Sequence, residues 1–270
     1  MIVEVKNLKK LYRLKKAVDN ISLTVHKGSV FGLIGPNGAG KSTTINLLSG
    51  ISEASSGVIN LFGERFYPSS LRIKRRIGVL PEVPALFSNL KVNEQLYFSG
   101  RIYGLDKRTL NRRIGESLDY FNLAEDQNKF IYELSAGMKK TLAFICSIIH
   151  GPELLFLDEP FERVDPMISK VLRGIIRQLK DSGRTVILTS HHLMLIEELC
   201  THIALMDKGK FLVIAETAEI LKKIADNGEQ GGQPLLEEFY LDFLLPQRKE
   251  ISLSWLQEKG GFRSGTDMKI

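Results

Sequence analysis

The feature that most constrains this chain is a glycine-rich stretch of nine residues between an apolar run and a helical pattern. The stretch reads Gly35-Pro36-Asn37-Gly38-Ala39-Gly40-Lys41-Ser42-Thr43 and fits the pattern G-x-x-x-x-G-K-[ST]. The apolar run at 29–34 has the length of a buried strand, and the pattern at 41–48 is helical. Glycines allow the backbone to wrap around a phosphate group, so that N–H groups and the helix N-terminus face the anion. All nine residues are therefore predicted to form a nucleotide-phosphate site.

Three residues of this stretch have separate predicted roles. Lys41 is expected to reach the β- and γ-phosphates with its ammonium group. The Ser42 hydroxyl is expected to bind Mg²⁺, and Thr43 is expected to help hold the phosphates.

A second motif is a pair of carboxylates, Asp158 and Glu159, directly after an apolar run at 154–157. Such a pair is also typical of a solvated strand end. With a phosphate-binding loop upstream in the same chain, it predicts that Asp158 holds Mg²⁺ through water. Glu159 is then placed to polarise an attacking water.

The order of apolar patterns indicates the fold class. Short runs at 57–62, 76–80, 154–157 and 185–189 read as strands, and the residues between the last two mark one helical face. Strand and helix in alternation are typical of an α/β fold with a parallel sheet. From about 92 to 130 the pattern is helical and charged. Past about 225 a turn-rich stretch begins, followed by an apolar segment at 235–245 that we expect to pack back.

Composition narrows the class of protein. The net charge is +6, but Lys and Arg are scattered rather than gathered into a stripe with aromatic residues, so we predict no nucleic-acid partner. We find no apolar run near the ~20 residues that cross a membrane, and no signal peptide, so a cytoplasmic location is expected. Cys146 and Cys200 lie among apolar residues and are expected to be reduced core thiols.

Four shorter segments, taken in chain order with the two motifs, resemble the nucleotide-binding domain of the ABC transporter family over about residues 2–224. Tyr12 matches the aromatic residue whose ring stacks on adenine. Residues 134–138, Leu-Ser-Ala-Gly-Met, match the family signature, usually L-S-G-G-Q. Asp165 matches the aspartate of the D-loop, and His191 matches the switch histidine. A tyrosine, a helix cap or a histidine alone is ordinary, but their common order indicates the family.

The resemblance implies a fold and a domain organisation. The fold is an α/β P-loop NTPase: a parallel sheet core, an N-terminal antiparallel β lobe over the adenine, and a small helical lobe at about 83–150. Residues 1–225 would form the ABC ATP-binding domain. Residues 226–270 would be a C-terminal extension that we expect to be partly flexible.

The resemblance also implies an ATPase with ATP and Mg²⁺ as cofactors. Lys41, Glu159 and His191 would be the catalytic residues, with His191 holding the γ-phosphate and the water in line. Ser135 and Gly137 would bind the γ-phosphate of ATP held by another subunit. The expected assembly is therefore a head-to-tail dimer, formed with a second copy or with a paired ABC subunit.

One departure from the family pattern lies near the metal. Glu82 stands where the family usually has glutamine. A glutamate accepts hydrogen bonds without donating and adds a negative charge. Metal coordination by Glu82 is retained as a prediction, while donation to water or phosphate is not expected.

Other departures concern the signature and the D-loop. Ala136 and Met138 replace the usual glycine and glutamine, and Glu162 and Arg163 replace small residues. His192 stands where an acidic residue is usual, and we assign it no role. Since Lys41, Asp158, Glu159 and His191 are all present, the chain is interpreted as hydrolytic.

The expected function is that of an ATP-hydrolysing subunit that drives a separate membrane-spanning subunit, for export. It would sit on the inner face of the cell membrane through that partner. One alternative is a weakly hydrolytic regulatory subunit, which Glu82 and the altered signature allow. Another is a soluble ABC ATPase acting on ribosomes or DNA. Such proteins usually carry two nucleotide domains, and this chain has one phosphate loop.

Overall fold

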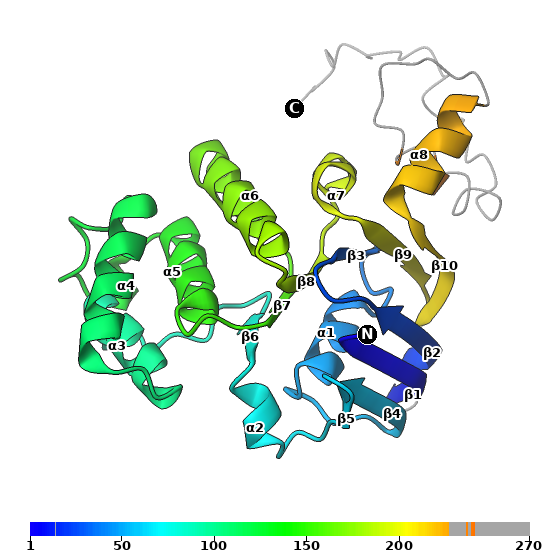
Figure 1. The fold of residues 1–270 in the computed structure, drawn as a ribbon, viewed down its shortest axis with the longest axis horizontal. Coiled ribbons are helices and arrows are strands. Elements are labelled where there is room, and N and C mark those ends of the chain that lie inside the picture. The colour runs from blue at the N-terminus through cyan, green and yellow to red at the C-terminus, as the bar shows by residue number, and fades with distance from the viewer. Residues whose placement is uncertain (14, 227–235, 237–238, 241–270) are drawn as a thin grey trace, which may run out of the picture.

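The computed structural model describes residues 1–13, 15–226, 236 and 239–240, and contains two sheets (Figure 1). The first sheet is antiparallel, with the strand order β2-β1-β4-β5. Its strands are β1 (Val3–Tyr12), β2 (Lys15–Val25), β4 (Ser56–Leu61) and β5 (Glu64–Arg65). The predicted N-terminal antiparallel lobe is thus confirmed.

The second sheet has the strand order β10-β9-β3-β8-β7-β6. Its strands are β3 (Val30–Ile34), β6 (Ile77–Leu80), β7 (Leu154–Leu157), β8 (Thr185–Thr189), β9 (His202–Asp207) and β10 (Lys210–Glu216). Neighbours from β9 to β6 are parallel, as expected. The edge strand β10 is antiparallel to β9, because a turn of two residues joins them.

Helices cover the second sheet and extend away from it. Those outside the 83–150 region are α1 (Lys41–Leu48), α2 (Leu71–Lys74), α6 (Pro166–Asp181), α7 (Leu193–Leu199) and α8 (Thr217–Asp226). Between β6 and β7 the chain forms α3 (Val92–Ile102), α4 (Lys107–Tyr120), the 3-10 helix η1 (Ile131–Glu133) and α5 (Ala136–Ile148). Helices α3, α4 and α5 gather on the side of the molecule away from the antiparallel sheet (Figure 1). The domain boundaries themselves stay a prediction.

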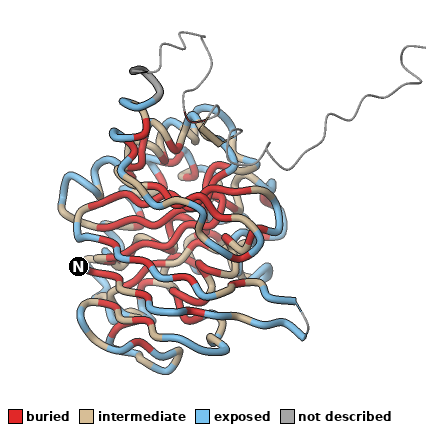
Figure 2. Tube along the Cα trace, turned by 90° about the vertical axis from the view of Figure 1, so that its right-hand side faces the viewer, coloured by how far each residue is buried: buried red, intermediate tan, exposed pale blue. Residues whose placement is uncertain are grey.

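The core has two parts, one on each face of the second sheet. Strand β3 shows the division: Val30 and Ile34 face the part under the helices, while Phe31 and Leu33 face the part shared with the antiparallel sheet. This alternation is the period of two that a strand imposes. Because β3, β7 and β8 are covered on both faces, every residue in them is buried, and buried residues follow the strands through the middle of the molecule (Figure 2). Burial on both faces explains why these strands appear in the sequence as mostly apolar runs and not as alternating patterns.

Most of the expected C-terminal extension lies outside the described residues. Within it, Leu236 is fully buried, and Phe239 and Tyr240 pack against the core. Neither Cys146 nor Cys200 forms a disulfide among the described residues, and burial raises the pKa of both thiols. Across the described part of the chain, no helix combines the length and apolar character needed to span a membrane.

Candidate functional site

The phosphate-binding loop runs from the end of β3 to the start of α1, as expected. Its glycines are required by close approach of other backbone segments. A Cβ on Gly35, where φ is +152°, would lie 2.1 Å from the Met206 carbonyl oxygen. A Cβ on Gly40, where φ is +112°, would lie 2.4 Å from the Ala17 carbonyl oxygen. Only glycine fits both the space and the backbone angles at these positions, so the two glycines let the loop pack directly against the backbones of Met206 and Ala17.

Lys41 is the first residue of α1, and its ammonium group points back into the loop. Lys41 Nζ donates to the carbonyl oxygens of Gly35 at 2.7 Å and Pro36 at 3.2 Å. Burial lowers the pKa of Lys41 from its ordinary value. The shift is opposed by the negative charges of three carboxylates, those of Glu159, Asp158 and Glu82. A cation therefore lies inside the loop and faces a cluster of acids.

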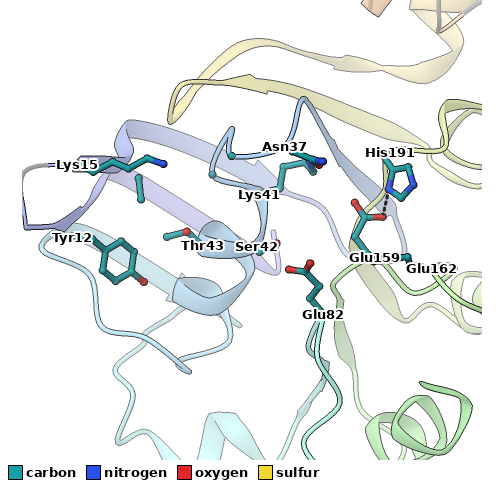
Figure 3. A pocket seen from close by; sticks show the side chains of 13 residues that line it. Tyr12, Lys15, Asn37, Lys41, Ser42, Thr43, Glu82, Glu159, Glu162 and His191 are labelled. Atoms are coloured by element: carbon teal, nitrogen blue, oxygen red, sulfur yellow. Dashed lines mark hydrogen bonds and ion pairs between the residues drawn. The ribbon is translucent and has the colours of Figure 1, made fainter. Parts of the chain in front are cut away.

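The loop forms one wall of a cavity of about 640 Å³ (Figure 3). This cavity brings together most of the residues that the sequence singled out. The described lining residues are Tyr12, Lys15, Ala17, Asn37, Gly38, Gly40, Lys41, Ser42, Thr43, Glu82, Glu159, Glu162 and His191. Gly35, Pro36 and Ala39 belong to the loop without being among them, and Ala39 is buried.

Tyr12 lies at the end of β1, across the cavity from Glu159 and His191 (Figure 3). Tyr12 is 47% exposed, and the Lys10 ammonium group lies 4.9 Å from the centroid of the Tyr12 ring. An exposed aromatic ring at the mouth of a polar cavity leaves its face available to a base. Stacking on adenine is consistent with this position and stays a prediction.

Asp158 lies behind the cavity, where its carboxylate is held by two hydroxyls. Asp158 Oδ1 accepts hydrogen bonds from Ser42 Oγ at 3.0 Å and from Thr189 Oγ1 at 2.6 Å. The parallel pairing of β7 with β8 brings the ends of these strands together. Mg²⁺ prefers hard oxygen ligands. Three such groups lie here: the Ser42 hydroxyl, the Asp158 carboxylate and, in the adjoining cavity, the Glu82 carboxylate. The residues therefore fit the implied metal.

Glu159 and His191 both line the cavity, and their side chains contact each other (Figure 3). Glu159 Oε2 lies 3.0 Å from His191 Nδ1, and the two side chains are 10% and 48% exposed. The Glu159 backbone is left-handed, with φ of +46°, and its N–H donates to Thr189 Oγ1 at 2.9 Å. A mostly buried carboxylate is thus aimed into the cavity by a strand end, a threonine and a histidine. That arrangement suits a base acting on water.

The signature residues lie elsewhere. Ser135 caps α5, its Oγ accepting from the Met138 N–H at 3.2 Å, and it is exposed. A Cβ on Gly137 would lie 2.8 Å from the Arg163 carbonyl oxygen. Neither Ser135 nor Gly137 is among the described residues that line the cavity. Their exposed helix N-terminus is open to an anion from outside this chain.

Two other residues named from the sequence lie close to the site, Asp165 of the D-loop match and His192, to which we assign no role. Asp165 caps α6, where its Oδ1 accepts from the Ile168 N–H at 3.0 Å. His192 precedes α7, and its ring centroid lies 4.1 Å from that of His191.

Several residues at the site were not singled out from the sequence. Lys15 and Ala17 line the cavity, and Thr189 holds both Asp158 and the Glu159 backbone. Glu162, noted from the sequence only as a departure in the D-loop, also lines the cavity. Thr189 has no local signal, since only the adjacency of β7 and β8 gives it a role. Lys140 is also buried beside the carboxylates. Its local signal in the sequence is a lysine two positions before the apolar run at 142–145.

Comparison with known proteins gives matches over most of the chain. A family model described as "ABC transporter" matches residues 18–162. The linearmycin resistance ATP-binding protein of Bacillus subtilis is 36% identical over 223 residues, which are 83% of this chain and 72% of that protein. The Nod factor export ATP-binding protein I of Cupriavidus metallidurans is 33% identical over 220 residues, 82% of this chain and 73% of its own. A solved structure of an ATP binding subunit of an ABC transporter has a TM-score of 0.82 at 28% identity, covering 90% of this chain and 100% of that one.

Proposed function

This chain belongs to the ABC transporter family as an ATP-binding ATPase subunit, and on that premise we propose that it works as a nucleotide-dependent dimer driving a separate membrane-spanning subunit. Residues 1–225 would form the ATP-binding domain, on the inner face of the membrane through that partner. One observation carries the proposal. The phosphate loop, Tyr12, Glu159 and His191 share one cavity, while the signature residues lie outside it.

The cavity residues have distinct roles in this proposal. Tyr12 stacks on adenine, and the loop with Lys41 and Thr43 holds the phosphates. Mg²⁺, held from the side of Ser42, Asp158 and Glu82, would supply positive charge to the phosphate oxygens when bound. Glu159 polarises the attacking water, and His191, which contacts Glu159, holds the γ-phosphate and the water in line.

A head-to-tail dimer would complete the site. The N-terminus of α5, with Ser135 and Gly137, carries the positive partial charge of a helix start, and Ser135 caps only the Met138 N–H among the hydrogen bonds of the described residues. This helix N-terminus is exposed and lies outside the cavity of its own chain. It can therefore bind the phosphates of an ATP that a second subunit holds. ATP would then join two subunits, and hydrolysis would release them.

An apolar patch supports a separate partner. It consists of the exposed side chains of Phe87, in the loop after Glu82, and of Phe98 and Ile102, which lie one turn apart in α3. Phe87 and Phe98 meet edge to face, with ring centroids 5.2 Å apart. Exposed apolar patches of this kind are typical of interaction sites. Glu82 lines the ATP cavity, and Phe87 of the patch follows it by five residues in the chain, so the patch and the cavity are joined by a short segment.

Export is the direction we propose. The relative named for Nod factor export supports it.

The ATPase site is tested by Lys41→Ala in the purified chain. Loss of the ammonium group that holds the phosphates should abolish detectable steady-state hydrolysis. Lys180→Ala, which removes an exposed lysine at the end of α6, is the matched control and should hydrolyse ATP normally. Turnover near wild type in Lys41→Ala would overturn the assignment of this cavity.

The partner is tested by Phe98→Asp on the patch, with Tyr67→Asp on another exposed aromatic residue as the control. Phe98→Asp should lose co-purification in detergent with the integral membrane subunit, while its own ATPase activity remains. Equal retention of that subunit by both variants would show that the patch is not the docking surface.

A further inference from the structure

Lys140 is a buried cation whose three hydrogen bonds all go to backbone carbonyls. It lies on α5 and is 4% exposed. Its Nζ donates to the carbonyl oxygens of Glu82 at 2.9 Å, Asp158 at 3.1 Å and Pro81 at 3.4 Å. An ammonium group has three donors and no acceptor. All of its donors are therefore used on two segments that are remote from α5 in the chain.

These two segments carry the carboxylates on the metal side of the cavity. Pro81 and Glu82 follow β6, and Asp158 follows β7. The two strands are parallel neighbours, and the Asp158 N–H donates to the Leu80 carbonyl oxygen at 2.8 Å. Just beyond this last hydrogen bond between the strands, Lys140 Nζ bridges the two chain segments by binding the carbonyl oxygens of Glu82 and Asp158. It thus sets how the backbones of Glu82 and Asp158 lie relative to each other.

The same helix has a second contact with the catalytic segment. Gly137 approaches the Arg163 carbonyl so closely that a Cβ would lie 2.8 Å from that oxygen. Arg163 lies four positions after Glu159. Helix α5 therefore contacts the backbone at Pro81 and Glu82, at Asp158, and again at Arg163, all from one turn near its start. Ser135 is about 7.5 Å from Lys140 along the helix, at 1.5 Å per residue.

We propose that Lys140 is a positioning residue, which ties the signature helix α5 to the backbones of Glu82 and Asp158 and so sets the geometry of the metal-side carboxylates. A shift of α5 at its exposed N-terminus is then transmitted to the carboxylates of the same chain. The inference rests on the proposed roles of Glu82 and Asp158, and it adds a residue that touches neither nucleotide nor water.

The test uses a matched set of variants of the full chain. Lys140→Met keeps an unbranched side chain of similar length and removes all three donors. Lys140→Arg restores donors to the carbonyls, and Lys140→Gln keeps one donor group for use if the methionine variant does not fold. Lys139→Met is the control, since it removes a charge from the next residue, whose Nζ contacts only the Tyr132 carbonyl oxygen, at 3.4 Å, among the hydrogen bonds of the described residues.

Three readouts separate positioning from general loss of structure. Hydrogen exchange should speed up at the Asp158 amide in Lys140→Met, relative to a peptide from β9. The affinity for ATP in EDTA should stay within about threefold of wild type, because the phosphate loop is intact, while the gain in affinity on adding Mg²⁺ is lost. Turnover should fall by about 10²-fold, as expected for a misplacement near 1 Å. Lys140→Arg should recover most of each readout.

Two outcomes would overturn the inference. One is Lys140→Met, or Lys140→Gln in its place, behaving as Lys139→Met does in exchange and in Mg²⁺-dependent affinity. The other is an equal loss of ATP affinity with and without Mg²⁺, which would indicate general damage. Either is distinguishable from failure of the proposed function, which would appear as normal turnover in Lys41→Ala.

Discussion

Replacing Glu159 by glutamine tests both the base and the dimer in one variant. The amide has nearly the size and shape of the carboxylate, and it can still hydrogen-bond to His191 Nδ1, now 3.0 Å from Glu159 Oε2. The backbone N–H bond to Thr189 Oγ1 is unaffected. What is lost is the negative charge that draws a proton from water.

The expected size of the effect follows from the geometry. General-base assistance is worth about 10²–10⁴-fold in rate, or about 3–5 kcal/mol of transition-state stabilisation. Glu159 is mostly buried and is oriented by both His191 and Thr189, so we expect its contribution to the rate to lie within that range. Turnover of Glu159→Gln should therefore fall by about 10²–10⁴-fold. ATP binding should remain, because the phosphate loop is intact.

The assays are steady-state phosphate release and sizing chromatography. With hydrolysis slow, ATP should hold two chains together, so Glu159→Gln should elute as a dimer with ATP while wild type stays mostly monomeric. Ser135→Arg, added to Glu159→Gln, should abolish the dimer by filling the space of the γ-phosphate.

Glu162→Gln is the matched control for Glu159→Gln. It neutralises another carboxylate of the same cavity and should keep turnover within a few-fold of wild type, since we assign Glu162 no proton transfer. A Glu159→Gln protein that hydrolyses ATP normally and stays monomeric with ATP would refute both the base assignment and the shared site.

Three further predictions concern other residues. Tyr12→Ala should weaken ATP binding by about 1–3 kcal/mol in a nucleotide titration while turnover at saturation persists; unchanged affinity would place Tyr12 outside the base site. Glu82→Gln should keep or raise turnover, and a collapse would show that the carboxylate itself is needed. His150, stacked on Tyr103, has its pKa lowered by burial from 6.5 to about 4, so it stabilises the fold above pH 6.5 and that contribution disappears as pH falls through 4. Between pH 7 and pH 4 wild type should lose up to about 3 kcal/mol more unfolding free energy than His150→Phe in urea titrations, whereas parallel curves would contradict this.

The sequence determined the parts of the site that are continuous in the chain. The nine residues from Gly35 to Thr43 need only a strand before and a helix after, and both were readable as local apolar patterns. Asp158 and Glu159 were readable for the same reason, because β7 is a fully buried strand with two carboxylates at its end. The antiparallel lobe and the helical segments followed from the resemblance and from local periodicity.

Only the tertiary structure decided which of these pieces meet. That Thr189 holds Asp158, and that His191 reaches Glu159, depend on β8 lying beside β7, although α6 separates them in the chain. The three carbonyl contacts of Lys140 likewise depend on how α5 docks against the ends of β6 and β7. The physical reason is the same in each case. Strand order and helix docking are chosen by how the whole core packs, and side-chain positions around the cavity follow from that packing rather than from neighbouring residues.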